Sequence, residues 1–215
     1  MNKEFGDLSA PITYDGDTLM DRIENGMSHF RSIFLNEDIK PRLYGKRIYF
    51  EISKVYKRNY TLPLPERYLH LVSLSDDEKF TVYPCNNEYA SYSICQNLCE
   101  EFSQIPCFQL LGRWECPYRL SRIHWIPEII RLANEGNECI KFWEKEVKDK
   151  TAGKKYLKYY LRYTYGFTDY VIIFRNDSGS EFVFISAYPV CSRKAKKDFD
   201  KDYAAYAQKT KGPKV

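Results

Sequence analysis

Four consecutive segments in the second half of the chain have the residue pattern of β-strands, and they constrain the fold more than any other feature. They are rich in aromatic and β-branched residues, which favour pleated strands. The segments are Ile140–Val147, Lys155–Tyr165, Tyr170–Arg175 and Glu181–Val190. Asn176-Asp-Ser-Gly-Ser joins the last two and has the composition of a hairpin turn. The pattern therefore predicts a four-stranded antiparallel sheet.

Predicted helices accompany this sheet. Tyr118–Asn134 has apolar residues at helical spacing, although Pro127 should kink or divide that helix. Arg193–Gln208 places its aromatic residues on one helical stripe. The first half is expected to hold strands at Arg47–Tyr56, Tyr68–Leu74 and Lys79–Tyr83, and a helix at Tyr89–Phe102. The predicted class is α+β, with an antiparallel four-stranded sheet packed with helices in the C-terminal half, preceded by a smaller mixed α/β region.

The two halves of the chain carry opposite net charge. Residues 1–107 contain 12 lysines and arginines against 16 aspartates and glutamates, whereas residues 108–215 contain 21 against 13. A basic half indicates a polyanionic partner, although a solvated cationic surface explains the composition equally well. We expect residues 108–215 to form the functional domain and residues 1–107 to form an accessory or targeting region.

Alternate residues of a strand point to opposite faces of a sheet, so the predicted faces can be sorted by parity. Within Lys155–Tyr165 the odd positions are mostly apolar or aromatic and are expected to face the core. The even positions interleave cations and phenols: Tyr156, Lys158, Tyr160, Arg162 and Thr164. Cations neutralise phosphates and aromatic rings stack on bases, so this face has the pattern of a nucleic-acid surface. An ordinary solvent-facing sheet is the alternative.

The last strand divides in the same way. Parity places Phe182, Phe184, Ser186 and Tyr188 on one face, and Val183, Ile185 and Ala187 on the other. Burial of the aliphatic set beneath a helix would leave Ser186 and Tyr188 on an open face, beside the cations of the second strand. The two phenylalanines fit a polar face poorly and indicate that another layer covers part of it.

Three short motifs in this half resemble a known family. They are Arg119-Leu-Ser-Arg-Ile-His124-Trp-Ile, Asp169-Tyr-Val-Ile-Ile-Phe and Glu181-Phe-Val-Phe-Ile-Ser-Ala-Tyr-Pro-Val190. Over about residues 116–192 the chain resembles the barnase–EndoU–colicin–RelE (BECR) superfamily of ribonucleases, particularly its phage-associated and polymorphic-toxin branches. Those branches carry an R-x-x-R-I-x-W-I helix and a final strand close to I-T-A-Y-P-V. Ser186 stands where the family usually has threonine, which preserves the hydroxyl.

The resemblance implies a metal-independent endoribonuclease, in which the 2′-hydroxyl of RNA attacks the adjacent phosphate and leaves a 2′,3′-cyclic phosphate. Such chemistry needs a proton acceptor, a proton donor and cations that stabilise the phosphorane. His124 is then the candidate acid or base, with a structural role at the edge of the core as its alternative. Lys155, Lys158 and Arg162 are the candidate charge stabilisers. Ser186 and Tyr188 are the candidates that orient the phosphate, and Tyr188 is also an alternative proton donor. The candidate RNA-binding residues are Arg119, Arg122, Tyr156, Tyr160 and Arg175.

The resemblance implies a toxin-like enzyme whose substrate is RNA. It also implies a second partner, a cognate inhibitor or immunity protein. A non-catalytic RNA-binding module and a protein–protein adaptor with a basic face stay open as alternatives. The polar start of the chain lacks a secretory pattern and no segment is long and apolar enough to span a membrane, so we expect action in the cytoplasm.

No metal or other cofactor is expected. Among Cys85, Cys95, Cys99 and Cys107, only the pair Cys95 and Cys99 has a zinc-like spacing, and buried thiols explain that pair better. Cys191 has no histidine nearby in the sequence, which argues against a cysteine nucleophile. His70 is a reserve catalytic candidate.

Overall fold

Two compact units make up the chain in the computed structural model, which describes residues 4–53, 56–57, 60–75, 105–148, 153, 155–176 and 180–210. The sheet unit consists of Met1–Leu8, Pro41–Phe50 and Glu128–Val215. The helical unit consists of Ser9–Lys40 and Glu51–Pro127. The predicted strand Lys79–Tyr83 and the predicted helix Tyr89–Phe102 lie outside the described residues.

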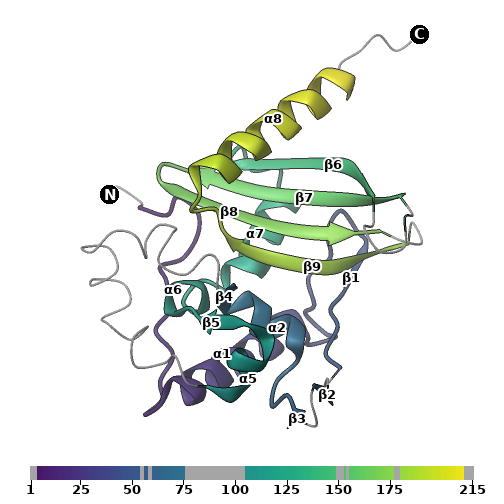
Figure 1. The fold of residues 1–215 in the computed structure, drawn as a ribbon. Helices are drawn as coiled ribbons and strands as arrows, with labels where there is room; N and C mark the ends of the chain where they lie inside the picture. The colour runs from purple at the N-terminus through teal and green to yellow at the C-terminus, as the bar shows by residue number, and fades with distance from the viewer. Residues whose placement is uncertain are drawn as a thin grey trace. The chain divides into compact units, whose positions relative to one another are not determined.

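A five-stranded sheet forms the centre of the sheet unit (Figure 1), in the order β1-β9-β8-β7-β6. Its strands are β1 (Arg47–Tyr49), β6 (Ile140–Lys148), β7 (Lys155–Tyr165), β8 (Thr168–Arg175) and β9 (Glu181–Pro189). The four late strands are antiparallel neighbours, as predicted. The protein is therefore α+β, but the prediction of a four-stranded, purely antiparallel sheet is wrong, because β1 adds a fifth strand parallel to β9.

The fifth strand comes from the acidic first half of the chain. Its register pairs Arg47 with Glu181 and Tyr49 with Val183. The strand predicted at Arg47–Tyr56 is only three residues long in the structure. The sheet unit thus takes residues from both sides of position 107, where the charge balance changes.

Helices flank the late strands in the sequence. The predicted helix Tyr118–Asn134 consists of α6 (Pro117–Leu120) and α7 (Trp125–Asn134), separated by a turn at 121–124. Pro127 lies in the first turn of α7, where the backbone N–H has no helical partner, so the proline fits without breaking the helix. α8 (Arg193–Thr210) follows β9 and runs across the sheet towards β6 (Figure 1).

The helical unit contains short elements: α1 (Leu19–Phe34), β2 (Tyr56–Lys57), β3 (Tyr60–Thr61), α2 (Glu66–Leu71), β4 (Ser73–Ser75), α5 (Pro106–Leu111), β5 (Arg113–Glu115) and α6. The strand predicted at Tyr68–Leu74 is wrong, because most of this segment is α2. A short apolar run does not distinguish a buried strand from a buried helix. Among the helices in the described part of the chain, none has the length and apolarity needed to cross a membrane.

The core of the helical unit forms around α1. A capping box starts this helix, since Thr18 and Asp21 exchange hydrogen bonds between side chain and backbone. The buried stripe of α1 consists of Leu19, Ile23, Met27, Phe30 and Phe34. The fully buried Tyr68 donates its hydroxyl hydrogen bond to the Ile23 carbonyl at 2.9 Å, which satisfies its polar tip inside the core.

Candidate nucleic-acid interface

One face of the sheet unit carries the cations, phenols and hydroxyl that parity selected in β7 and β9. Register places Lys158 opposite Arg175, and Arg162 opposite Val171, which in turn faces Tyr188. Ser186 is directly opposite Ile173, and Ile173 is directly opposite Tyr160 on its other side. Residues directly opposite one another point to the same side of a sheet. We call this side the α8 face, and it holds seven of the predicted site residues: Tyr156, Lys158, Tyr160, Arg162, Arg175, Ser186 and Tyr188.

A β-bulge in β9 changes the predicted sorting of that strand. The register passes from Ile173 with Ser186 to Phe174 with Phe184, so Ile185 is the extra residue. Phe182 and Phe184 therefore face the side opposite the α8 face, where their rings contact Phe174 at 5.5 and 5.9 Å. The prediction that these phenylalanines share a face with Ser186 and Tyr188 is wrong, because simple alternation fails across a bulge.

Three cations lie in one line across the α8 face. Lys145 of β6 is directly opposite Lys158 of β7, and Lys158 is directly opposite Arg175 of β8. We call this line the cationic row. Like charges directly across a sheet repel one another. The ammonium of Lys158 also lies 5.9 Å from the ring centre of Tyr156, which adds an aromatic group beside the row.

The middle of the α8 face is aromatic and covered by α8. Trp143 and Tyr160 stack with ring centres 5.1 Å apart and planes 8° apart. Phe199 and Tyr203 of α8 approach Trp143 edge-on, at 6.0 and 5.8 Å. Burial, with a smaller contribution from Asp202, raises the pKa of Tyr160 to about 12, so its phenol stays protonated at neutral pH. This part of the face is not open to solvent, contrary to the expectation of an open surface.

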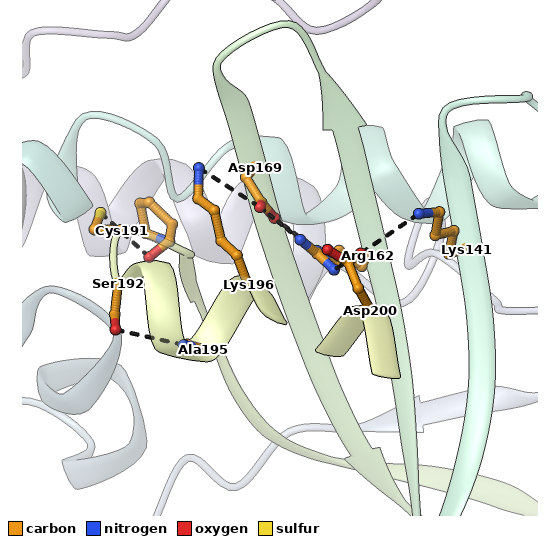
Figure 2. Close-up of polar contacts among 9 residues, drawn as sticks. Lys141, Arg162, Asp169, Cys191, Ser192, Ala195, Lys196 and Asp200 are labelled. Atoms are coloured by element: carbon orange, nitrogen blue, oxygen red, sulfur yellow. Dashed lines mark hydrogen bonds and ion pairs between the residues drawn. The ribbon is translucent and has the colours of Figure 1, made fainter. Parts of the chain in front are cut away.

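A buried ion pair lies at the end of the α8 face where α8 begins (Figure 2). Arg162 donates to both carboxylate oxygens of Asp169, at 2.8 and 2.7 Å, and to Asp200 of α8 at 2.9 Å. The side chains of Arg162 and Asp169 are only 3% and 7% exposed, whereas that of Asp200 is 56% exposed. Burial opposes the charge of Arg162, but its bonds to the two aspartates outweigh burial and raise its pKa.

Lysines extend this network at its edges. Lys196 approaches Asp169 at 3.7 Å, and Lys141 approaches Asp200 at 3.7 Å. Lys141 is directly opposite Arg162 in the register, so both belong to the α8 face. A predicted charge stabiliser, Arg162, is thus engaged with two carboxylates, one of which comes from α8.

Four predicted site residues lie elsewhere. Lys155 points to the side opposite the α8 face and binds Glu146 at 2.6 Å; this bond raises its pKa. Arg119, Arg122 and His124 belong to the helical unit. The predicted site is therefore divided between the two units, with His124 in the helical unit and Lys158 and Arg162 in the sheet unit.

The three helical-unit candidates have well-defined surroundings. Arg119 donates to the Ser73 carbonyl at 2.7 Å, where Arg113 also donates at 3.0 Å. Arg122 is 5% exposed, donates to the Tyr118 carbonyl at 2.9 Å and lies 3.6 Å from the ring centre of Tyr118. His124 is 6% exposed, with its ring 6.1 Å from that of Trp125. These contacts give the two arginines structural roles in the helical unit.

Several residues of the α8 face were not predicted as site residues. They are Lys141 and Lys145 of β6, Asp169 of β8, and Asp200 and Asp202 of α8. The sequence does contain a signal for the lysines: Lys141, Trp143 and Lys145 occupy alternate positions of one predicted strand and therefore share a face. Placing them beside Lys158 and Arg162 requires the hairpin register, which the sequence pattern does not specify.

The remaining candidates for metal or nucleophilic chemistry are only partly described. Cys107 is buried, and burial raises its pKa to about 11; Cys85, Cys95 and Cys99 lie outside the described residues. Within the described ranges, no cluster of three histidine, cysteine or acidic side chains has the arrangement of a metal site. His70 lies in α2, 3.6 Å from Glu66.

Comparison of the chain with protein-family models, with curated proteins and with solved structures finds no match.

Proposed function

We propose that this protein acts on RNA through the α8 face of the sheet unit, as an endoribonuclease that needs no metal ion. The cationic row carries the proposal. Lys145, Lys158 and Arg175 are held side by side by the strand register, although like charges in directly opposite positions destabilise a sheet. Asp202 already accepts from the ammonium of Lys145, at 2.9 and 2.7 Å, so the row attracts anions. Nucleic acids supply a regular series of anionic phosphates.

Aromatic groups beside the cations support a single-stranded ligand. Tyr156 lies next to the cationic row, and the stacked Trp143 and Tyr160 form the next cross-strand pair on the same face. Unpaired bases stack on accessible rings, at roughly 1–3 kcal/mol for each base. The half-buried Tyr156 offers such a ring, whereas α8 covers the Trp143–Tyr160 stack. Because β-strands rise about 3.3 Å per residue, Lys158 and Arg162 lie about 13 Å apart along β7 and would serve different phosphates.

Cleavage is the part of the proposal that rests on the resemblance to BECR ribonucleases. On the α8 face, Tyr188 is the proposed proton donor to the leaving oxygen, and Ser186 is the proposed group that orients the phosphate. Cations of the face would stabilise the negative charge that develops on the phosphorane. The 2′-oxygen would form a bond to phosphorus as the bond to the 5′-oxygen breaks, with the 2′-hydroxyl proton passing to water and the Tyr188 proton to the 5′-oxygen. The products would be a 2′,3′-cyclic phosphate and a 5′-hydroxyl. The same resemblance leads us to propose toxin-like action in the cytoplasm, controlled by an inhibitor protein.

One observation favours a second candidate function, an RNA-binding module without catalysis. All three histidines of the chain, His29, His70 and His124, belong to the helical unit. The α8 face therefore contains no side chain whose ordinary pKa lies near neutral pH, which is the usual property of a general acid or base.

Incubation of the full chain with total RNA in the presence of EDTA tests the proposal. The expected result is cleavage that leaves cyclic-phosphate ends and is strongly reduced by the double variant Lys158→Ala/Arg175→Ala. Arg131→Ala is the matched control, because it removes an exposed cation that lies in α7 rather than in a strand of the sheet. Salt-sensitive binding without cleavage would establish the second candidate instead. Absence of both would refute any action on RNA.

The role of His124 has its own test within this assay. His124→Ala is expected to keep RNA binding by the α8 face, because the ring belongs to the other unit. Loss of cleavage with unchanged binding would make His124 the proton donor or acceptor. Full cleavage would assign that role to another group, with Tyr188→Phe as the next variant.

A further inference from the structure

Two carboxylates of α8 lie on cations of the α8 face. Asp200 accepts a hydrogen bond from Arg162 at 2.9 Å and lies 3.7 Å from the ammonium of Lys141. Asp202 accepts from the ammonium of Lys145 through both oxygens, at 2.9 and 2.7 Å. Lys141 pairs with Arg162 across β6 and β7, and Lys145 belongs to the cationic row. Each of these two lines of cations therefore receives one anion from α8.

The same helix also covers the aromatic centre of the face. Phe199 contacts both members of the Trp143–Tyr160 stack, with ring centres 6.0 and 5.8 Å away. A nucleic-acid strand would bring the same two kinds of group to this surface: anions to the cations, and flat rings to the aromatic pair. α8 thus occupies the positions that an RNA strand would need.

The ion pairs that hold α8 are of a kind that a polyanion can replace. No residue of Arg193–Thr210 is fully buried. The ion pairs of Asp200 and Asp202 are partly open to water, with side chains 56% and 25% exposed, so solvent and salt weaken them. In proteins most of the stability of a helix comes from tertiary packing rather than from the helix propensity of its residues. The other contacts of α8 with the sheet are apolar: Ala195, Phe199, Tyr203 and Tyr206 pack on the cluster around Trp143 and Tyr160, the rings on which bases would stack.

We propose that Asp200 and Asp202 occupy two phosphate subsites of the RNA site, and that α8 is an autoinhibitory strap that RNA displaces. The first subsite consists of Arg162 and Lys141, and the second is centred on Lys145. This inference rests on the proposed action on RNA. It predicts that RNA binding and α8 docking compete with each other, and that removal of either carboxylate favours RNA.

Single substitutions in α8 test the competition directly. The probe is a short, fluorescently labelled single-stranded RNA with 2′-O-methyl groups, which cannot be cleaved by attack of a 2′-hydroxyl. Asp200→Asn and Asp202→Asn are each expected to tighten its binding about fivefold, the factor expected from loss of a partly screened ion pair. Asp198→Asn is the matched control, because it removes the same charge from an exposed position of the same helix. Its effect should be less than about twofold.

Hydrogen–deuterium exchange of α8 supplies a second measurement on the wild-type chain. If RNA displaces the strap, the amides of residues 193–210 exchange faster in the RNA complex than in the free protein. Slower or unchanged exchange in a saturated complex would overturn the inference, as would equal effects of Asp200→Asn and Asp198→Asn.

The two proposals fail in different ways. If the wild-type chain binds the probe and Lys158→Ala/Arg175→Ala weakens binding, the proposed RNA site stands whatever α8 does. In that case unchanged affinity of the Asp200 and Asp202 variants refutes the strap alone. If the wild-type chain and both α8 variants all fail to bind the probe, the RNA site itself is refuted and the strap with it.

Discussion

The buried pair of Arg162 and Asp169 makes the sharpest prediction about stability. Asp169→Asn removes the carboxylate that takes two charge-assisted hydrogen bonds, at 2.8 and 2.7 Å, from a guanidinium that is only 3% exposed. The variant leaves Arg162 with Asp200 as the carboxylate partner among the described contacts. Breaking one partner of a buried pair costs roughly 3–5 kcal/mol, because the remaining charge stays buried without full compensation.

We expect the lower end of this range, about 3 kcal/mol, since Asp200 still neutralises part of the charge. For a chain of this size the loss corresponds to a fall of roughly 6–12 °C in melting temperature. Asp200→Asn is the matched comparison, because its target is the same guanidinium but its side chain is 56% exposed. That variant should cost no more than about 1 kcal/mol.

Urea unfolding followed by far-ultraviolet circular dichroism measures both variants, and Arg162→Met with Arg162→Met/Asp169→Asn completes a double-mutant cycle. The two residues should couple, so that the double variant loses much less than the two single variants together. A loss below about 1 kcal/mol for Asp169→Asn, or equal losses for Asp169→Asn and Asp200→Asn, would contradict the buried pair.

Two further predictions concern other parts of the sheet unit. Burial raises the pKa of Tyr160 to about 12, above the ordinary value of 10, so its contribution to stability is complete below pH 10 and is lost as the pH rises towards 12. Between these limits the free energy of unfolding should fall by roughly 2–3 kcal/mol more for the wild type than for Tyr160→Phe. Unfolding measured over this pH range tests this, and parallel curves of unfolding free energy against pH would contradict it. Gly6 has φ +64°, and a Cβ there would collide with the Tyr163 hydroxyl, which accepts from the Asp7 N–H and donates to the Phe5 carbonyl. Gly6→Ala should therefore lower the free energy of unfolding by about 2 kcal/mol, and an unchanged melting temperature would show that this turn does not need glycine.

Sequence periodicity predicted the late strands well because β6, β7 and β8 are regular. Parity in β7 correctly grouped Tyr156, Lys158, Tyr160 and Arg162 on one face. In β9 the same rule failed at Ile185, since a bulge shifts alternation by one residue and leaves no clear mark in the sequence. The parallel β1 was also missed as part of this sheet, because its partner β9 is more than 130 residues away in the sequence.

The predicted site was incomplete for a different reason. Arg162 was selected as an exposed cation, but the structure buries it between Asp169 and Asp200. The amphipathic pattern of Arg193–Gln208 predicted α8, with its aromatic stripe, but no local signal shows which face of the sheet such a stripe covers. His124 was grouped with the sheet cations because their motifs follow one another in the sequence. The structure assigns them to different compact units.

The salt dependence of RNA affinity tests the central claim most directly. Binding of the uncleavable RNA is measured over a series of salt concentrations for the wild type, for Lys158→Ala/Arg175→Ala and for Arg131→Ala. Each phosphate neutralised on a single strand contributes about 0.7 to the steepness of the plot of log affinity against log salt. Loss of both cations should therefore reduce the steepness by about 1.4, while Arg131→Ala leaves it unchanged. Equal slopes for all three proteins would show that RNA does not bind at the cationic row.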